Sequence, residues 1–311
     1  MITMLRKAFL IGIFCVMSVG SAMAADLLQP FVLAYTTSGD VSTVASDVKG
    51  KLTGAGFKIV GEYAPYDGAD IIVVTNDALK ANAAKSGNPD DDEFGGYGAI
   101  QRVSVTKNGD SIEVAYTNPV YMAAAYRMAG DLSDVRAQLE KALGSEQDYG
   151  SEKDLTADDL RKYHYSFGMP YFDEPNDLAE YDSYEDAIKA VEASLAKGAG
   201  NTKKIYRVDI PGKQETVFGV ALLGPSDSDT CGDTFVMNTI DLSTPRHTPH
   251  LPYEIVVSEG NVWSLRPEFR IAIDWPHLAF MGGGEGSFFS IKCVMSSIPK
   301  VLKQAAGQPG K

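Results

Sequence analysis

The sequence predicts an α+β protein built from two similar domains, each an antiparallel sheet with two helices packed on one face. Two observations lead to this fold class. Short segments with strand-like residues or helical spacing alternate along the chain, and their order in residues 25–144 recurs in residues 181–311. A composition of 44% hydrophobic and 22% charged residues is typical of a globular protein.

The first 24 residues have the layout of a secretory signal peptide. Arg6 and Lys7 form a positive start, an apolar run extends over 8–19, and Ala22-Met23-Ala24 is a cleavage signal. The apolar run is shorter than the roughly 20 residues that span a membrane. We therefore expect cleavage after Ala24, a location in the bacterial periplasm, and no stable membrane insertion afterwards.

The next segments form the first predicted domain, residues 25–144. A helix begins at Ser38 or Asp40, because apolar residues then recur at helical spacing until Gly54. Asn108-Gly109 between two alternating runs is a strong hairpin signal, and Asn118-Pro119 ends that hairpin. In chain order we expect a strand at 31–35, a helix at 40–54, strands at 57–60, 71–74, 103–105 and 112–116, and a helix at 133–143.

The second predicted domain, residues 181–311, repeats this order. Ser183 caps a helix that Gly198 ends, and Trp275-Pro276 takes the place of Asn118-Pro119. In chain order we expect strands at 204–209, 216–223, 254–257 and 269–273 and a helix at 298–306. Residues 145–180 connect the two domains, with a short helix at 156–160. Their aromatic run, 163–172, is too apolar for a free linker and is expected to pack between the domains.

Charge and cysteine content narrow the choice of partners. The chain has 28 Lys and Arg against 41 Asp and Glu, a net charge of −13, which opposes binding to nucleic acid. A small molecule or a periplasmic protein is the expected partner. Cys15 leaves with the signal peptide, so Cys231 and Cys293 remain. In an oxidising compartment they are expected to form one disulfide, worth about 3 to 4 kcal/mol, with two free thiols as the alternative.

Several segments resemble the family called domain of unknown function 302. The likeness lies in Leu251-Pro252-Tyr253-Glu254 and the strand after it, and in Leu52-Thr53-Gly54-Ala55-Gly56-Phe57. It also includes the hairpin from Arg102 to Pro119, although Ala99-Ile100-Gln101 departs from the Leu-Pro pattern. The resemblance implies a small α+β sheet-and-helix unit. It implies no activity and no catalytic residue.

The most suggestive polar cluster lies at the hairpin of the second domain. If the hairpin brings its ends together, five side chains could surround one ligand. These ligand-binding candidates are His247, His250, Glu254, Arg270 and Asp274. In an alternative interpretation, imidazole and thioether groups bind a transition metal or a haem iron. That set is His247, His250, His277 and Met281. Loop histidines without a ligand are a third interpretation.

Other motifs are weaker. The glycine-rich run 281–287 lacks the Lys-Ser/Thr of a phosphate-binding loop, and the acidic loops 88–93 and 227–233 lack the closing Glu of a calcium loop. The chain has no G-x-S-x-G, H-E-x-x-H or C-x-x-C motif. Arg266, Glu268, Arg270 and Asp274 alternate along the expected strand 269–273 and its approach, as on a solvated sheet face.

These observations favour a periplasmic non-enzymatic binding or accessory protein, with a possible cleft between the domains. A metal- or haem-binding redox accessory protein is the alternative, and the sequence leaves open whether the protein is an enzyme.

Overall fold

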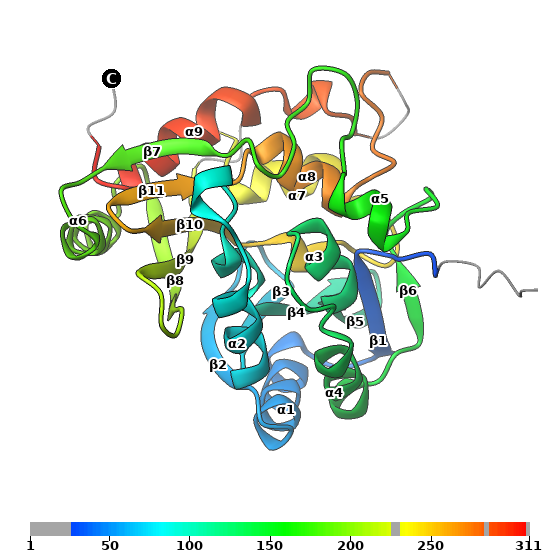
Figure 1. Cartoon of the computed structure of the whole chain (residues 1–311). Coiled ribbons are helices and arrows are strands. Elements are labelled where there is room, and N and C mark those ends of the chain that lie inside the picture. The colour runs from blue at the N-terminus through cyan, green and yellow to red at the C-terminus, as the bar shows by residue number, and fades with distance from the viewer. Residues whose placement is uncertain (1–25, 225–230, 283–285, 309–311) are drawn as a thin grey trace, which may run out of the picture.

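The protein contains two antiparallel sheets, one from each half of the chain (Figure 1). The computed structural model describes residues 26–224, 231–282 and 286–308, so the expected signal peptide lies outside the described residues. The predicted α+β class, with two similar halves, is confirmed.

The first sheet has the strand order β2-β3-β4-β5-β1-β6. Helices α1 and α4 pack together on one of its faces, as the sequence predicted. The elements of this half are β1 (Phe31–Thr37), α1 (Val41–Gly54), β2 (Lys58–Tyr63), β3 (Ala69–Thr75), α2 (Asp77–Lys85), η1 (Pro89–Asp91), η2 (Gly95–Gly98), β4 (Gln101–Asn108), β5 (Ser111–Thr117), α3 (Pro119–Ala125) and α4 (Ser133–Leu143).

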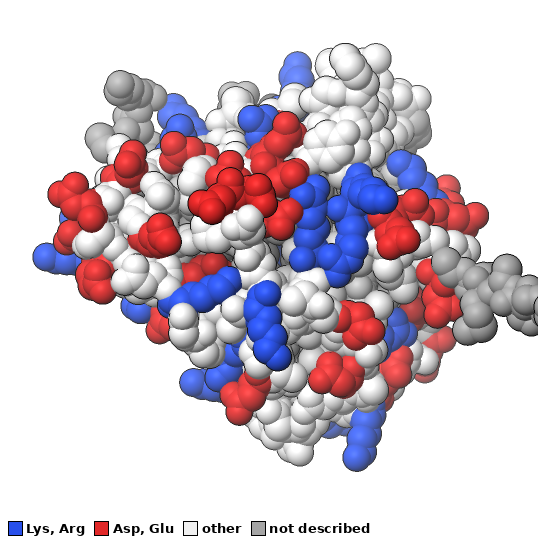
Figure 2. Space-filling view, in the orientation of Figure 1, with Lys and Arg blue, Asp and Glu red and all other residues white. Residues whose placement is uncertain are grey.

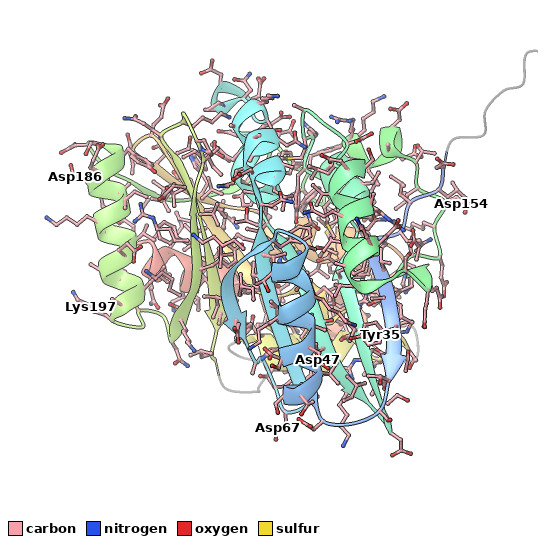
Figure 3. All side chains as sticks on the ribbon, turned by 90° about the horizontal axis from the view of Figure 1, so that it is seen from below. Tyr35, Asp47, Asp67, Asp154, Asp186 and Lys197 are labelled. Atoms are coloured by element: carbon pink, nitrogen blue, oxygen red, sulfur yellow. A yellow bond between two sulfur atoms is a disulfide. The ribbon has the colours of Figure 1, made fainter. Side chains whose placement is uncertain are left out.

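The second sheet has the strand order β8-β9-β10-β11-β7 and carries α6 and α9 on one face. Figure 3 marks α6 by Asp186 and Lys197, on the side of the molecule away from β1 with Tyr35. The elements of this half are β7 (Asn176–Glu180), α6 (Tyr184–Ala196), β8 (Thr202–Asp209), β9 (Glu215–Leu222), α7 (Asp233–Ile240), η3 (Thr248–His250), β10 (Tyr253–Ser258), β11 (Asn261–Ser264), α8 (Pro267–Asp274), η4 (Phe289–Ile291) and α9 (Val294–Ala305).

The two halves share their irregularities as well as their strand order. One extra residue, Val60, interrupts the ladder of β2 with β3, and Ile205 interrupts the ladder of β8 with β9. In the same way Ala34 bulges from β1 and Leu178 from β7. Bulges at corresponding places in two sheets are specific features of a fold. The repeat is therefore a property of the backbone and not only of the element order.

The bulges also show which residue of β4 corresponds to which residue of β10, because both can be found by following the strand pairing from the bulge. Gly61, just after the first bulge, pairs with Val73, which pairs with Arg102. Tyr206, just after the second bulge, pairs with Gly219, which pairs with Glu254. Arg102 and Glu254 thus occupy equivalent positions in the two sheets.

Each half packs a short 3₁₀ turn against the sheet of the other half. Turn η2 of the first half packs on β9 and β10, and η3 of the second half packs on β3, β4 and β5. Strands β2 and β8 also lie against each other, and a Cβ added at Gly61 would lie only 2.5 Å from the carbonyl oxygen of Ile205. Only a residue without a side chain allows this approach. The two sheets therefore share one extensive interior contact.

Part of the predicted second half is wrong. Residues 269–273 belong to helix α8, and the strand that returns from the turn is β11. The counterpart of Asn118-Pro119 is Arg266-Pro267, because both prolines take the first position of a helix, α3 or α8, where a missing N–H costs nothing. The sequence interpretation also missed α2, α3 and α7.

The connector joins both sheets. Strand β6 (Gln147–Tyr149) extends the first sheet, and α5 (Ala157–Arg161) follows with Thr156 as its cap. The Tyr163 hydroxyl donates to the carbonyl of Ala272, 2.9 Å away, in the second half. Phe172 contacts both Tyr97 and Phe269. Tyr163 and Phe172, at the ends of the aromatic run, thus pack between the two halves as predicted, whereas Phe167 and Tyr171 are exposed.

The predicted disulfide is present. Cys231 and Cys293, with Cα atoms 5.8 Å apart, join the segment before α7 to the start of α9. The bond closes a segment with a sequence separation of 62 residues.

Replacing both residues, Cys231→Ser with Cys293→Ser, should lower the free energy of unfolding by about 2 to 4 kcal/mol, because the unfolded chain loses a constraint. Urea unfolding at equilibrium measures this loss. Reductant should lower the stability of the unmodified protein by a similar amount and leave the variant unchanged. Equal stability of the two proteins without reductant would contradict the prediction.

Candidate functional site

Four buried charged side chains meet where the two sheets face each other. Arg102 of β4 forms an ion pair with Glu254 of β10, and the Arg270 Nε lies 3.3 Å from the other oxygen of Glu254. The Arg270 Nη1 lies 2.5 Å from the Asp274 Oδ2. None of the four is more than 4% exposed. We call these residues the charge cluster.

The charge cluster is electrically balanced. It holds two guanidinium groups and two carboxylates, so no net charge is buried. Arg270 and Glu254 are hydrogen-bonded, whereas Arg102 contacts Glu254 only as an ion pair, and its Nε and the Asp274 Oδ1 have no hydrogen-bond partner among the described residues. The Tyr206 hydroxyl donates to Glu254 over 3.3 Å, and Arg270 also donates to the carbonyl oxygen of His250. Buried ion pairs persist only when such contacts offset the loss of hydration.

His250 extends the charge cluster. Its Nδ1 lies 2.6 Å from the Asp274 Oδ2, and its Nε2 lies 3.4 Å from the Tyr253 hydroxyl. Burial and the charge of Arg270 lower the pKa of His250 to about 4. Burial acts to raise the pKa of Asp274, but Arg270 and the His250 hydrogen bond outweigh it and lower the pKa. At neutral pH a neutral His250 therefore donates from Nδ1 to an ionised Asp274.

Asp274, His250 and Tyr253 have the order of a proton relay, but all three side chains are buried. A relay acts on a substrate only when its last group can reach that substrate. In this structure the three residues instead hold α8 against η3 and β10.

The His247 ring and the His250 ring both contact the indole ring of Trp275. The His247 ring stacks on Trp275, with centroids 5.0 Å apart, and the His250 ring meets the same indole at 4.8 Å. The His247 Nδ1 contacts the carbonyl oxygen of Asp274 at 2.9 Å. Burial lowers the pKa of His247 to about 3, so its ring is neutral.

The structure brings all five predicted ligand-binding residues into one buried region. Arg270 and Asp274 lie on helix α8 and not on the predicted strand. Because they are four residues apart, both lie on one face of that helix. Their side chains contact one another and their protein neighbours. A ligand-binding role for them stays a prediction.

The four residues of the metal interpretation are only partly together. The His277 ring lies 6.4 Å from the His247 ring, whereas the His250 ring contacts the Trp275 indole. Met281 is 65% exposed. Across the described ranges, no three His, Cys, Asp or Glu side chains are grouped so that they could hold a metal ion.

A pocket opens beside this indole ring, and the sequence interpretation missed it. Its volume is about 310 Å³. It is lined by Ile240, Leu242, Ser243, Trp275, His277, Leu278, Ala279 and Gly286. The Trp275 indole N–H is buried and has no hydrogen-bond acceptor in the structure. We call this the Trp275 pocket. Of its lining residues, the sequence analysis singled out His277, as a metal candidate, and Trp275, next to a proline.

The weaker motifs contribute no ligand site that the structure describes. In the first acidic loop, Glu93 pairs with Arg127 at 2.6 Å, and the Asn88 amide donates to Asp91 at 2.5 Å. Most of the second acidic loop and the middle of the glycine-rich run, 283–285, lie outside the described residues. Asp233, at the end of the second loop, is buried and accepts hydrogen bonds from the Tyr63 hydroxyl and from the Leu222 amide.

Comparison with known proteins provides no relative: no family model, no curated protein and no solved structure matches the chain. Among the described helices, none has the length and apolar character needed to cross a membrane.

The variant Arg102→Met should lower the free energy of unfolding by about 3 to 5 kcal/mol, because it leaves an excess negative charge in the interior. Adding Glu254→Gln restores the charge balance, so the double variant should lose less than the sum of the two single losses. Urea unfolding of the four proteins measures this coupling. Arg207→Met, at an exposed ion pair with Asp209, serves as the control and should cost at most about 1 kcal/mol. Strictly additive losses would argue against a coupled cluster.

Asp233 should make stability depend on pH, because burial raises its pKa to about 7. A raised carboxyl pKa destabilises the folded state as pH rises from the unfolded value, near 4, to the folded value. Asp233→Asn keeps an oxygen for Tyr63 and Leu222 but cannot ionise. Its stability relative to the unmodified protein should therefore grow between about pH 4 and pH 7 and level off above. Urea unfolding across this range measures the difference, and a constant difference would contradict the assignment.

Proposed function

We propose that this protein is an exported, non-enzymatic binding or accessory protein that holds a small molecule in the Trp275 pocket. The signal-like residues 1–24 support export to the periplasm. The resemblance to domain of unknown function 302 belongs to the same proposal and adds no chemistry to it.

The observation that carries the proposal is the Trp275 pocket. Its volume of about 310 Å³ lies at the lower end of the range of small-molecule sites, roughly 300 to 1,000 Å³. An unpaired buried N–H costs on the order of 1 to 3 kcal/mol, which an acceptor atom can recover. Trp275 lines the pocket and carries such an N–H, although the nitrogen itself is buried.

The walls also indicate the chemical class of the ligand. His277 and Trp275 contribute rings, and Ile240, Leu242 and Leu278 contribute aliphatic surface. A small planar molecule can stack on the exposed His277 ring and pack against the aliphatic side chains, with an acceptor atom directed toward the Trp275 side of the pocket. We therefore propose a compact aromatic or heteroaromatic ligand with a carbonyl or ring-nitrogen acceptor.

Binding without catalysis is supported by the state of the polar groups behind the pocket. His250 and Asp274 are hydrogen-bonded to each other, and His247 is held on a backbone carbonyl. In the proposal the two histidines fix the position of Trp275, since both of their rings contact its indole.

A metal- or haem-binding redox accessory role is the second proposal. The observation in its favour is the approach of His247 and His277, whose rings lie 6.4 Å apart beside the Trp275 pocket. Elemental analysis and a visible absorption spectrum of protein from periplasm test it. The proposal expects stoichiometric metal or a Soret band that His277→Ala removes. Protein without metal and without visible absorption would contradict it.

Native mass spectrometry of protein purified gently from periplasm tests the leading proposal. We expect a small-molecule adduct on the unmodified protein and its loss in Leu242→Trp, because the larger side chain fills the pocket. Leu242 is 47% exposed, so the fold should tolerate the change. Leu223→Trp, at a similarly exposed leucine away from the pocket lining, is the matched control and should keep the adduct. Absence of any adduct on the unmodified protein would contradict the proposal.

A further inference from the structure

Exposed apolar side chains gather at one end of the protein. Nine large hydrophobic residues of the described chain are exposed, and six of them come from only two segments, the connector loop and residues 280–295. These six are Phe167, Tyr171, Phe280, Met281, Phe289 and Met295. We call them the aromatic patch. Figure 2 shows an uncharged area at the upper right, over the connector and the chain that follows α8.

The centre of the aromatic patch is a built feature of the fold. The Phe289 amide donates to the Phe280 carbonyl oxygen, 3.1 Å away, which places these two residues side by side. Tyr165 of the connector packs on Phe288 with ring centroids 4.9 Å apart, and Cys293 fixes the segment through its disulfide. A narrow cleft of about 50 Å³ lies between the connector loop and residues 280–295. It is lined by Met169, Glu268, Phe280, Phe288, Phe289, Lys292, Val294 and Met295.

The cleft carries one cation and one carboxylate that do not pair with each other. The Lys292 ammonium lies over the Phe289 ring, 4.9 Å from its centroid. Glu268 has no ion-pair partner in the described chain, and its burial raises its pKa. Arg266 acts on Glu268 only from a distance, as a weaker opposing charge. A carboxylate beside apolar surface is stabilised by a cation that arrives with a partner.

We propose that the aromatic patch is the contact surface for a second copy of this chain, arranged about a two-fold axis. In a two-fold contact the same surface meets itself, so every charge faces a residue from the same set. Lys292 can then pair with the partner's Glu268, and Glu268 with the partner's Lys292. The apolar side chains around these two pairs leave water at the same time.

The chemistry of the cleft favours a second copy over a different protein. A partner that is only basic would suit Glu268 but would face Lys292, and an acidic partner would meet the reverse conflict. A copy of the same cleft satisfies both charges. This inference is independent of the Trp275 pocket.

Sedimentation velocity of the mature protein over a range of concentrations tests the proposal. We expect a concentration-dependent dimer. Glu268→Lys alone and Lys292→Glu alone should each weaken the dimer at least about tenfold, because like charges then face each other. The variant with both changes should recover the dimer, since the pairs are restored with their charges exchanged.

Two controls make the outcome decisive. Lys300→Glu reverses a charge on the exposed side of α9, away from the cleft lining, and should leave the dimer unchanged. Circular dichroism of each variant shows that it is folded. A monomer at all concentrations would overturn the proposal and is the result expected if another protein occupies the patch. A double variant that fails to recover the dimer would also overturn it, because Lys292 and Glu268 would then not face each other. The dimer and the ligand site are tested separately. If the small-molecule adduct in the Trp275 pocket persists in variants that are monomeric, the proposed function stands even where the dimer proposal fails.

Discussion

The relative position of the two sheets depends on the buried ion pair between Arg102 and Glu254. Each residue comes from a different sheet, and neither can be hydrated where it lies. Breaking such a pair leaves a buried charge without a partner, at a cost of about 3 to 5 kcal/mol. The two sheets are therefore held in one relative position, in which β4 and β10 approach each other at their first residues.

This contact also explains why the two halves differ in sequence while sharing a backbone. Arg102 and Glu254 occupy equivalent positions when counted from the bulges of β2 and β8. Two copies of the first half would bring arginine against arginine, and two copies of the second half would bring carboxylate against carboxylate. Opposite charges at equivalent positions make each half complementary to the other and not to itself.

The Trp275 pocket depends on the same arrangement. Arg270 contacts Glu254 with one edge and Asp274 with another, which fixes helix α8. Asp274 holds His250 through its side chain and His247 through its carbonyl oxygen, and both histidine rings contact the Trp275 indole. A wall of the proposed binding site is thus set by a charge pair in the interior.

Local patterns in the sequence predicted many of the elements, and their failures have physical causes. The hairpin at Asn108-Gly109 and helix α4 follow from local signals, and both are present. The alternating residues Phe269 to Asp274 suggested a strand, but Pro267 starts a helix, and tertiary contacts satisfy Arg270 and Asp274 inside the protein. Strand β11 has only four residues, too few for a visible pattern.

The sequence predicted which residues of the candidate site come together, but not that they are buried in an ion-pair network. All five polar residues chosen from the sequence do come together, because the turn before β10 and helix α8 converge. Their partner Arg102 lies about 150 residues away in the first half, and no local signal links it to Glu254. Without Arg102 the cluster looked like an open ligand site and not a buried ion-pair network.

The central claim is that the two halves form one cooperative unit around this network. Both tryptophans, Trp263 and Trp275, belong to the second half, and Trp263 also stacks on Phe94 of the first half. Their fluorescence therefore reports on the second half and on its contact with the first, whereas far-ultraviolet circular dichroism reports on both halves throughout. Equilibrium unfolding in urea followed by the two signals tests the claim directly. We predict a single transition with the same midpoint for both. Separate midpoints, with structure that outlasts the change in tryptophan fluorescence, would contradict it.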